Sequence, residues 1–232
     1  MRLFLSSQDL GNYPEVAATL AGKNKRAGYI KNAQDDLLPQ ERNFSTPEKK
    51  KMFEAAGFEF EEVDLRDYFG KPKELLNLLS SFGSIWSAGG NTFILRRAMK
   101  ASGLDKILKK LLEEDKILYG GWSAGACIAA PSLHGIEYGD RPQPDVVPKN
   151  YPIKQTIWEG LNLVPFMIVP HCGSDWFGKE ADKSIKYFKK HKIPYKPLED
   201  GQVIVIDGKK TEFLKWESLA LTLAPVSWAL GL

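Results

Sequence analysis

Short apolar runs alternate with longer amphipathic segments along most of the chain. Short apolar runs predict strands, and apolar residues spaced three to four apart predict helices. The predicted strands are 3–5, 27–30, 58–63, 84–87, 117–122 and 163–169, followed by a hairpin of 203–206 and 211–214. The predicted helices are 46–56, 74–81, 93–101, 104–114, 124–130 and 179–191. This alternation predicts an α/β fold, a mainly parallel sheet with helices on both faces and a C-terminal β-hairpin.

The composition is that of one globular domain. The chain has 232 residues, of which 43% are hydrophobic and 26% are charged, which is enough to bury a core without disulfides or a metal. We expect a single α/β domain over residues 1–215 and an apolar tail over 216–232, whose role the sequence leaves open between packing, binding a partner and a weak membrane contact. Residues 134–160 show little periodicity and are predicted to form a long loop, a feature that often has a functional role.

Charge and targeting signals exclude several classes of protein. The formal charge of +3 is too small to indicate a nucleic-acid partner. No apolar run is long enough to span a membrane, and the N-terminus does not resemble a signal peptide. We therefore expect a cytoplasmic protein, for which a homodimer is one option.

Cysteine and histidine are sparse. Cys127 and Cys172 form no Cys-x-x-Cys motif, and His134, His171 and His191 have no metal-ligand spacing. This pattern predicts no metal site, and nothing in the sequence suggests a cofactor.

Gly121-Trp122-Ser123-Ala124-Gly125 matches the G-x-S-x-G nucleophile elbow. It follows a predicted strand and precedes a predicted helix, as the motif requires. A sharp turn there projects the serine hydroxyl from the sheet, and small flanking residues let strand and helix approach. The pattern makes Ser123 the candidate nucleophile.

A serine nucleophile needs a base, and His171 is the best candidate. It follows an apolar strand that we expect beside the elbow strand, whereas His191 ends a lysine-rich helix and His134 lies in the long loop. A carboxylate should orient the imidazole. Glu137, Asp140 and Asp145 in the loop are candidates, and spacing does not choose among them.

Gly89-Gly90-Asn91 follows another predicted strand. Two glycines allow close backbone approach and expose N–H groups. We expect Gly90 and Asn91, with the N–H of Ala124, to bind an oxyanion or the substrate. The alternative is an ordinary turn in which Asn91 caps the next helix.

These motifs together resemble the dipeptidase E (α-aspartyl dipeptidase) and cyanophycinase family of serine peptidases. The strings that carry the resemblance are Ala88-Gly89-Gly90-Asn91-Thr92-Phe93, Gly121-Trp122-Ser123-Ala124-Gly125-Ala126, Leu161-Asn162-Leu163-Val164-Pro165-Phe166 and Pro170-His171. The resemblance implies a fold like that of class I glutamine amidotransferases. It also implies Ser123 as nucleophile, His171 as base, Asp140 as acid with Glu137 second, and the N–H groups of Gly90 and Ala124 as oxyanion donors.

The function so implied is hydrolysis of short peptides through a Ser-His-Asp/Glu triad and an acyl-enzyme, with an acidic N-terminal residue as one substrate class. The α-aspartyl dipeptidases use an arginine after the histidine to bind the aspartate carboxylate, but only lysines such as Lys179, Lys183 and Lys186 follow His171 here. Two alternatives are an esterase or amidase with the same triad, and a binding protein that retains the elbow without catalysis.

Overall fold

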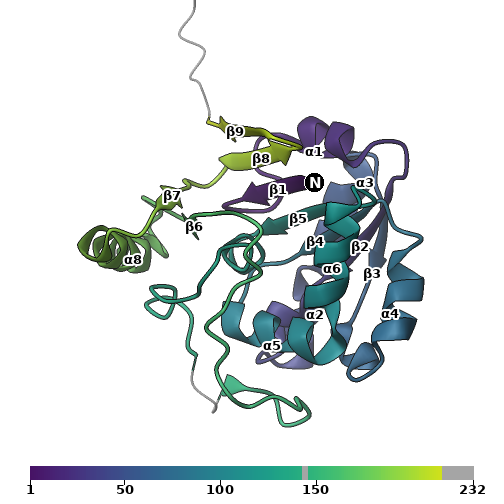
Figure 1. Ribbon diagram of the computed structural model, residues 1–232, viewed down its shortest axis with the longest axis horizontal. Helices are drawn as coiled ribbons and strands as arrows, with labels where there is room; N and C mark the ends of the chain where they lie inside the picture. Colours follow the sequence, from purple (N-terminus) through teal and green to yellow (C-terminus); the bar gives the residue numbers. More distant parts are fainter. Residues whose placement is uncertain (143–145, 216–232) are drawn as a thin grey trace, which may run out of the picture.

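The computed structural model describes residues 1–142 and 146–215, and its centre is a seven-stranded sheet (Figure 1). The predicted tail 216–232 and Asp145 lie outside the described residues. The strands are β1 (Arg2–Ser6), β2 (Arg26–Ile30), β3 (Glu59–Glu62), β4 (Ser84–Ser87), β5 (Leu118–Trp122), β8 (Val203–Asp207) and β9 (Lys210–Leu214). Their order is β3-β2-β4-β5-β1-β8-β9. The first five run parallel and the β8–β9 hairpin pairs antiparallel with β1, which confirms the predicted fold class.

Helices connect the parallel strands and cover the sheet. They are α1 (Pro14–Ala21), α2 (Pro39–Phe44), α3 (Thr46–Ala55), α4 (Pro72–Leu79), α5 (Thr92–Ser102), α6 (Leu104–Glu113), α7 (Ala124–Cys127) and α8 (Gly178–His191), with 3-10 turns at Asn32–Gln34 and Leu65–Tyr68. The sequence pattern did not predict α1 and α2, which are short. The predicted helix 124–130 ends early, because the N–H groups of Ala129 and Ala130 bond three residues back rather than four.

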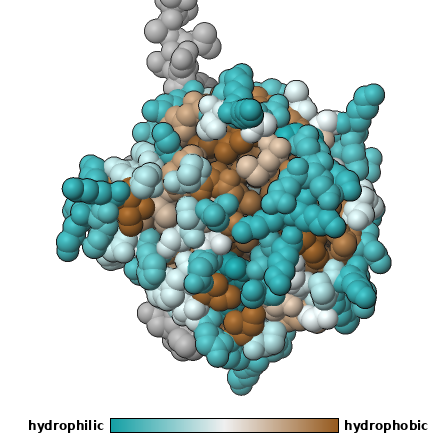
Figure 2. Space-filling model, in the orientation of Figure 1, coloured by the Kyte–Doolittle hydropathy of each residue, from teal (hydrophilic) through white to brown (hydrophobic). Residues whose placement is uncertain are grey.

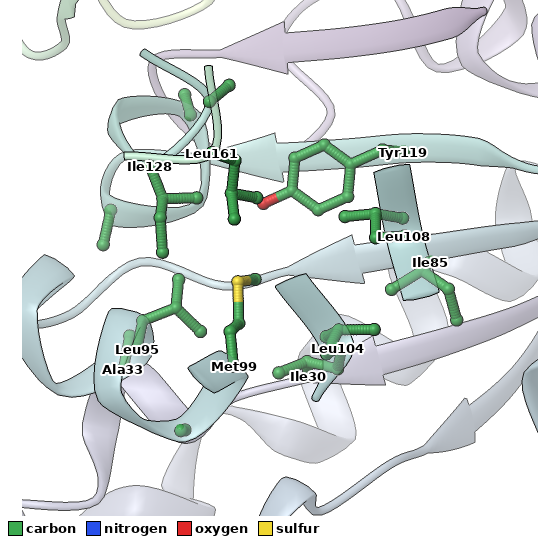
Figure 3. Close-up of a cluster of buried hydrophobic side chains, with 14 of the residues drawn as sticks. Ile30, Ala33, Ile85, Leu95, Met99, Leu104, Leu108, Tyr119, Ile128 and Leu161 are labelled. Carbon is green, nitrogen blue, oxygen red and sulfur yellow. The ribbon is translucent and has the colours of Figure 1, made fainter. Parts of the chain in front are cut away.

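Two hydrophobic clusters hold the sheet between its helices. On one face, side chains from β1, β2, β4 and β5 pack against α4, α5 and α6. Figure 3 shows part of this cluster, in which Ile30, Ile85 and Tyr119 of the strands meet Leu95, Met99, Leu104 and Leu108 of the helices. On the other face, Trp86 and Trp122 pack with Phe53 of α3 and with residues of α1. Successive side chains of a strand point to opposite faces of the sheet, so alternate residues of each strand pack against the helices on either side.

A smaller unit lies beside the main sheet. Strands β6 (Met167–Val169) and β7 (Tyr195–Pro197) form a separate parallel pair, flanked by α8 (Figure 1). The prediction that strand 163–169 lies beside the elbow strand was wrong, because β5 already has β4 and β1 as its neighbours. Instead, Val169 and Phe188 of this unit pack with Cys127 of α7 in a third hydrophobic cluster.

The face seen in Figure 2 is mostly hydrophilic, including α8, with smaller hydrophobic areas between the hydrophilic residues. Residues 146–160 form no helix or strand longer than an isolated bridge, as predicted for the long loop. In the part of the chain that the structure describes, no helix is long and apolar enough to cross a membrane.

Candidate active site

Ser123 stands at the junction of β5 and α7 with a strained backbone. Its φ of 52° and ψ of −115° are rarely adopted by a residue with a side chain. The turn is held by hydrogen bonds from the Ser123 N–H to the carbonyl oxygens of Ser7, at 3.1 Å, and Ser6, at 3.3 Å. A Cβ at Gly121 would lie 2.4 Å from the carbonyl oxygen of Gly125. The glycines of the motif are therefore required by the close approach of strand and helix.

Gly89 and Gly90 bring the end of β4 against this turn. A Cβ on Gly89 would lie 3.1 Å from the Cβ of Ser123 and 3.4 Å from its Oγ. Gly90 has a φ of +135°, and a Cβ there would meet the carbonyl oxygen of Ala33 at 2.5 Å. Within the described residues, the N–H groups of Gly90 and Ala124 donate no hydrogen bond to the protein. Both N–H groups are therefore available to a ligand.

Asn91 has a structural role in this turn. Its N–H donates to the carbonyl oxygen of Ala33 at 2.7 Å. Its side-chain oxygen accepts hydrogen bonds from the N–H groups of Phe93, at 2.9 Å, and Ile94, at 3.1 Å, and thereby caps α5. The geometry matches the capping alternative rather than an oxyanion role.

His171 follows β6 and is almost completely buried. Its φ of 60° marks a second strained backbone position at the site. Its Nδ1 lies 2.7 Å from Oδ1 of Asp200, a residue between β7 and β8. Its Nε2 is buried and has no hydrogen-bond partner in the structure. An imidazole that donates from Nδ1 to a carboxylate keeps Nε2 free to accept a proton.

Ser7, directly after β1, links these groups. Its Oγ accepts the His171 N–H at 2.8 Å and lies 2.7 Å from Asp200 Oδ1, to which it donates. Its carbonyl oxygen accepts the Ser123 N–H. One residue therefore connects the turn of the candidate nucleophile to the histidine–carboxylate pair.

Two aromatic side chains flank the imidazole. The ring of Trp176 lies 4.3 Å from that of His171 between centroids, and the ring of Phe177 lies 5.6 Å away. The Trp176 side chain is 62% exposed, so its outer face is open to solvent. Both residues thus form one wall of the surroundings of the histidine.

Among the described residues, neither of the two predicted acids forms a hydrogen bond with His171. Asp140 accepts a hydrogen bond from the Thr92 N–H at 2.8 Å and a second, short one from the Thr92 hydroxyl. Glu137 accepts from the N–H of Gly135 at 2.5 Å. The structure thus supplies Asp200 as the carboxylate on His171, where the resemblance implied Asp140 with Glu137 second.

Ser123 Oγ and His171 Nε2 share no direct hydrogen bond in this structure. Catalytic hydrogen bonds are often long in the free enzyme and shorten in the substrate complex. No group of three or more His, Cys, Asp or Glu among residues 1–142 and 146–215 is placed to hold a metal ion. The side chains and backbone N–H groups of this arrangement can support acyl transfer.

Sequence reasoning missed Ser7 and Asp200. Ser7 directly follows the first strand, and the rule that ligands lie at the carboxyl ends of parallel strands could have indicated it. Asp200 precedes Gly201 in the turn before β8, where it looks like an ordinary turn residue.

Comparison with known proteins identifies the family of the chain. The sequence profile of peptidase family S51 matches residues 7–214. An uncharacterized peptidase of Listeria monocytogenes is 32% identical over 172 residues, covering 74% of this chain and 78% of the relative. A Drosophila melanogaster protein named a probable alpha-aspartyl dipeptidase is 31% identical over 137 residues, covering 56% of this chain and 52% of the relative.

A solved structure has the same fold. It is described as that of a candidate peptidase E from Listeria monocytogenes, and it superposes with a TM-score of 0.73 at 26% identity over 92% of this chain and 98% of the other. The profile match spans β8 and β9 as well as the elbow and the strand before His171. The chain therefore belongs to peptidase family S51 and is a serine-type peptidase.

Proposed function

We propose that the enzyme hydrolyses short peptides, as a dipeptidase does, through Ser123, His171 and Asp200. The observation that carries this proposal is the connection through Ser7, which ties the backbone of Ser123 to the hydrogen-bonded pair of His171 and Asp200. Asp200 takes the place of Asp140 and Glu137 as the acid of the triad.

The reaction begins with transfer of the Ser123 hydroxyl proton to Nε2 of His171. Oγ then forms a bond to the scissile carbonyl carbon, and the carbonyl oxygen becomes an oxyanion. The N–H groups of Gly90 and Ala124 stabilise that charge. Asp200 keeps the proton on Nδ1 and stabilises the imidazolium that forms.

The C–N bond breaks as the imidazolium gives its proton to the leaving amine. Water then attacks the acyl-enzyme, and His171 takes a proton from it. The second tetrahedral intermediate collapses, releases the carboxylic acid and returns the proton to Ser123.

The test is a panel of dipeptides, longer peptides and simple esters, assayed with the wild type and with Ser123→Ala. We expect dipeptides to be cleaved and the variant to lose at least about 10³-fold in kcat, with some catalysis retained through the oxyanion donors. Cleavage of esters without any peptide would favour an esterase. Equal activity of wild type and variant would refute the serine mechanism.

A further inference from the structure

A small cavity opens beside the candidate nucleophile. Its walls include Ser123 and Ala124 at the elbow, Asp140 of the loop, and Phe177, Ala181 and Ser184 around α8. The volume of the cavity that a water-sized sphere can enter is about 20 Å³. One water molecule needs about 10–15 Å³ by the same measure. The cavity therefore admits one small group next to the atom that would attack the substrate.

Asp140 gives this cavity a negative charge. Its carboxylate accepts two hydrogen bonds from Thr92, and among the described residues no Lys, Arg or His forms an ion pair with it. Burial, with a contribution from the charge of Asp36, raises the pKa of this carboxyl to about 6 despite those hydrogen bonds. At neutral pH the group is still mainly ionised. It is a partly buried anion beside a ligand cavity, and a cation there would stabilise it.

We propose that this cavity receives the free α-ammonium group of the substrate and that Asp140 binds it. The proposal rests on the proposed function, which places the substrate's acyl carbon at Ser123 Oγ. In a peptide cleaved after its first residue, the α-ammonium is one carbon away from that acyl carbon. An ammonium group on the α-carbon can therefore reach the cavity lined by Ser123, Ala124 and Asp140.

The same cavity explains which groups fit poorly. Its described lining has no lysine or arginine, and α8 contributes Ala181 and Ser184. An acidic group there would face Asp140 without a cation, and an acylated amino group has no positive charge to pair with Asp140. The cavity adjoins Ser123, which favours the α-ammonium, next to the acyl carbon, over an ammonium at the end of a side chain.

The test uses aminoalkyl boronic acids, whose boron forms a tetrahedral adduct with a serine oxygen. The probes are 1-aminoethylboronic acid, its N-acetyl derivative, and the boronic analogue of Nα-acetyl-lysine, which has only a side-chain ammonium. Dissociation constants are measured by calorimetry on the wild type, Asp140→Asn and Glu137→Gln. Glu137→Gln makes the same change of charge in the same loop, outside this cavity.

We expect the wild type and Glu137→Gln to bind the free amine about 10- to 100-fold more tightly than either acetylated probe. Asp140→Asn should reduce that preference to about threefold or less. Its melting temperature and its binding of the N-acetyl probe report whether the fold and the serine are intact.

Three results would overturn the inference and leave the proposed function standing. They are equal binding of free and acetylated probes to the wild type, equal binding of the lysine analogue and the free amine, and a preference that survives in Asp140→Asn. Failure of all probes to bond to Ser123, with no Ser123-dependent hydrolysis, would refute the proposed function itself.

Discussion

Ser7 donates a hydrogen bond to Asp200, 2.7 Å away, although 193 positions separate the two residues in the sequence. The same oxygen accepts the backbone N–H of His171. It therefore sets both the place of the carboxylate and the place of the imidazole. The structure gives this hydroxyl a positioning role for the histidine–carboxylate pair.

Ser7→Ala should lower kcat about 10-fold and leave KM nearly unchanged, because a hydrogen bond to a charged group is lost away from the substrate. Steady-state kinetics on the best dipeptide measure this. Ser6→Ala is the matched control, since the Ser6 hydroxyl donates to the carbonyl oxygen of Asp9 and, among the described residues, has no other hydrogen-bond partner. Equal losses in both variants would show that the effect is general damage to the end of β1.

Asp200→Asn should reduce kcat by about 10⁴-fold on every substrate, including N-acetylated esters. An amide at this position can donate to Nδ1 and so favours the wrong tautomer of His171. The control is Asp175→Asn, an exposed carboxylate four positions after His171 that forms no hydrogen bond or ion pair with it in the described part of the chain. A loss confined to substrates with a free amino group would assign Asp200 to binding rather than to the triad.

Gly89→Ala should reduce kcat about 10-fold with little change in melting temperature. The new methyl group would lie 3.1 Å from Ser123 Cβ and 3.4 Å from its Oγ, so the nucleophile must shift. Gly178→Ala serves as the comparison, because its nearest new contact is an ordinary 3.5 Å. Full activity of Gly89→Ala would show that Ser123 tolerates displacement.

The pKa of Asp140 predicts a pH-dependent stability. Burial raises this pKa in the folded protein from the ordinary 3.8 to about 6, so the folded state binds the proton more tightly than the unfolded chain. The contribution is therefore fully present below about pH 4 and is lost as the pH rises to about 6. The loss is on the order of 1 to 3 kcal/mol, since the side chain is only partly buried.

Urea unfolding of the wild type and Asp140→Asn between pH 4 and pH 7.5 measures this contribution. The free energy of unfolding of the wild type should fall relative to that of the variant over this interval. Parallel curves would contradict the raised pKa. Asp36→Asn should reduce the effect, because Asp36 adds to the shift.

The fold could be predicted, and a candidate nucleophile named, because both depend on local signals. Strand and helix periodicity located most elements of the main sheet within a few residues, and the elbow motif is written in five consecutive residues, although distant backbone groups of Ser6 and Ser7 hold its turn. The prediction of His171 used only the rule about strand ends. Its stated reason was partly wrong, because β6 pairs with β7 and not with the main sheet.

The carboxylate that contacts His171 could not be predicted, because its identity depends on tertiary packing. Asp140 and Asp200 are both aspartates in loops, and nothing in their neighbouring residues distinguishes them. Thr92 donates to Asp140 at the start of α5, and Ser7 donates to Asp200 at the end of β1. These contacts determine which of the two aspartates lies beside His171. Both contacts join segments that are far apart in the sequence.

The serine and the histidine belong to separately built parts of the molecule. Ser123 is anchored to the main sheet, whereas His171 ends the smaller β6–β7 sheet. Among the described residues, the contacts between the two parts include apolar packing with α7 and the main core, a hydrogen bond from Cys127 Sγ to the carbonyl oxygen of Ile168, and the Ser7 hydroxyl on His171. A small shift at these contacts would move His171 away from Ser123 without unfolding either sheet. Gentle warming or low denaturant should therefore inactivate the enzyme before its circular dichroism changes.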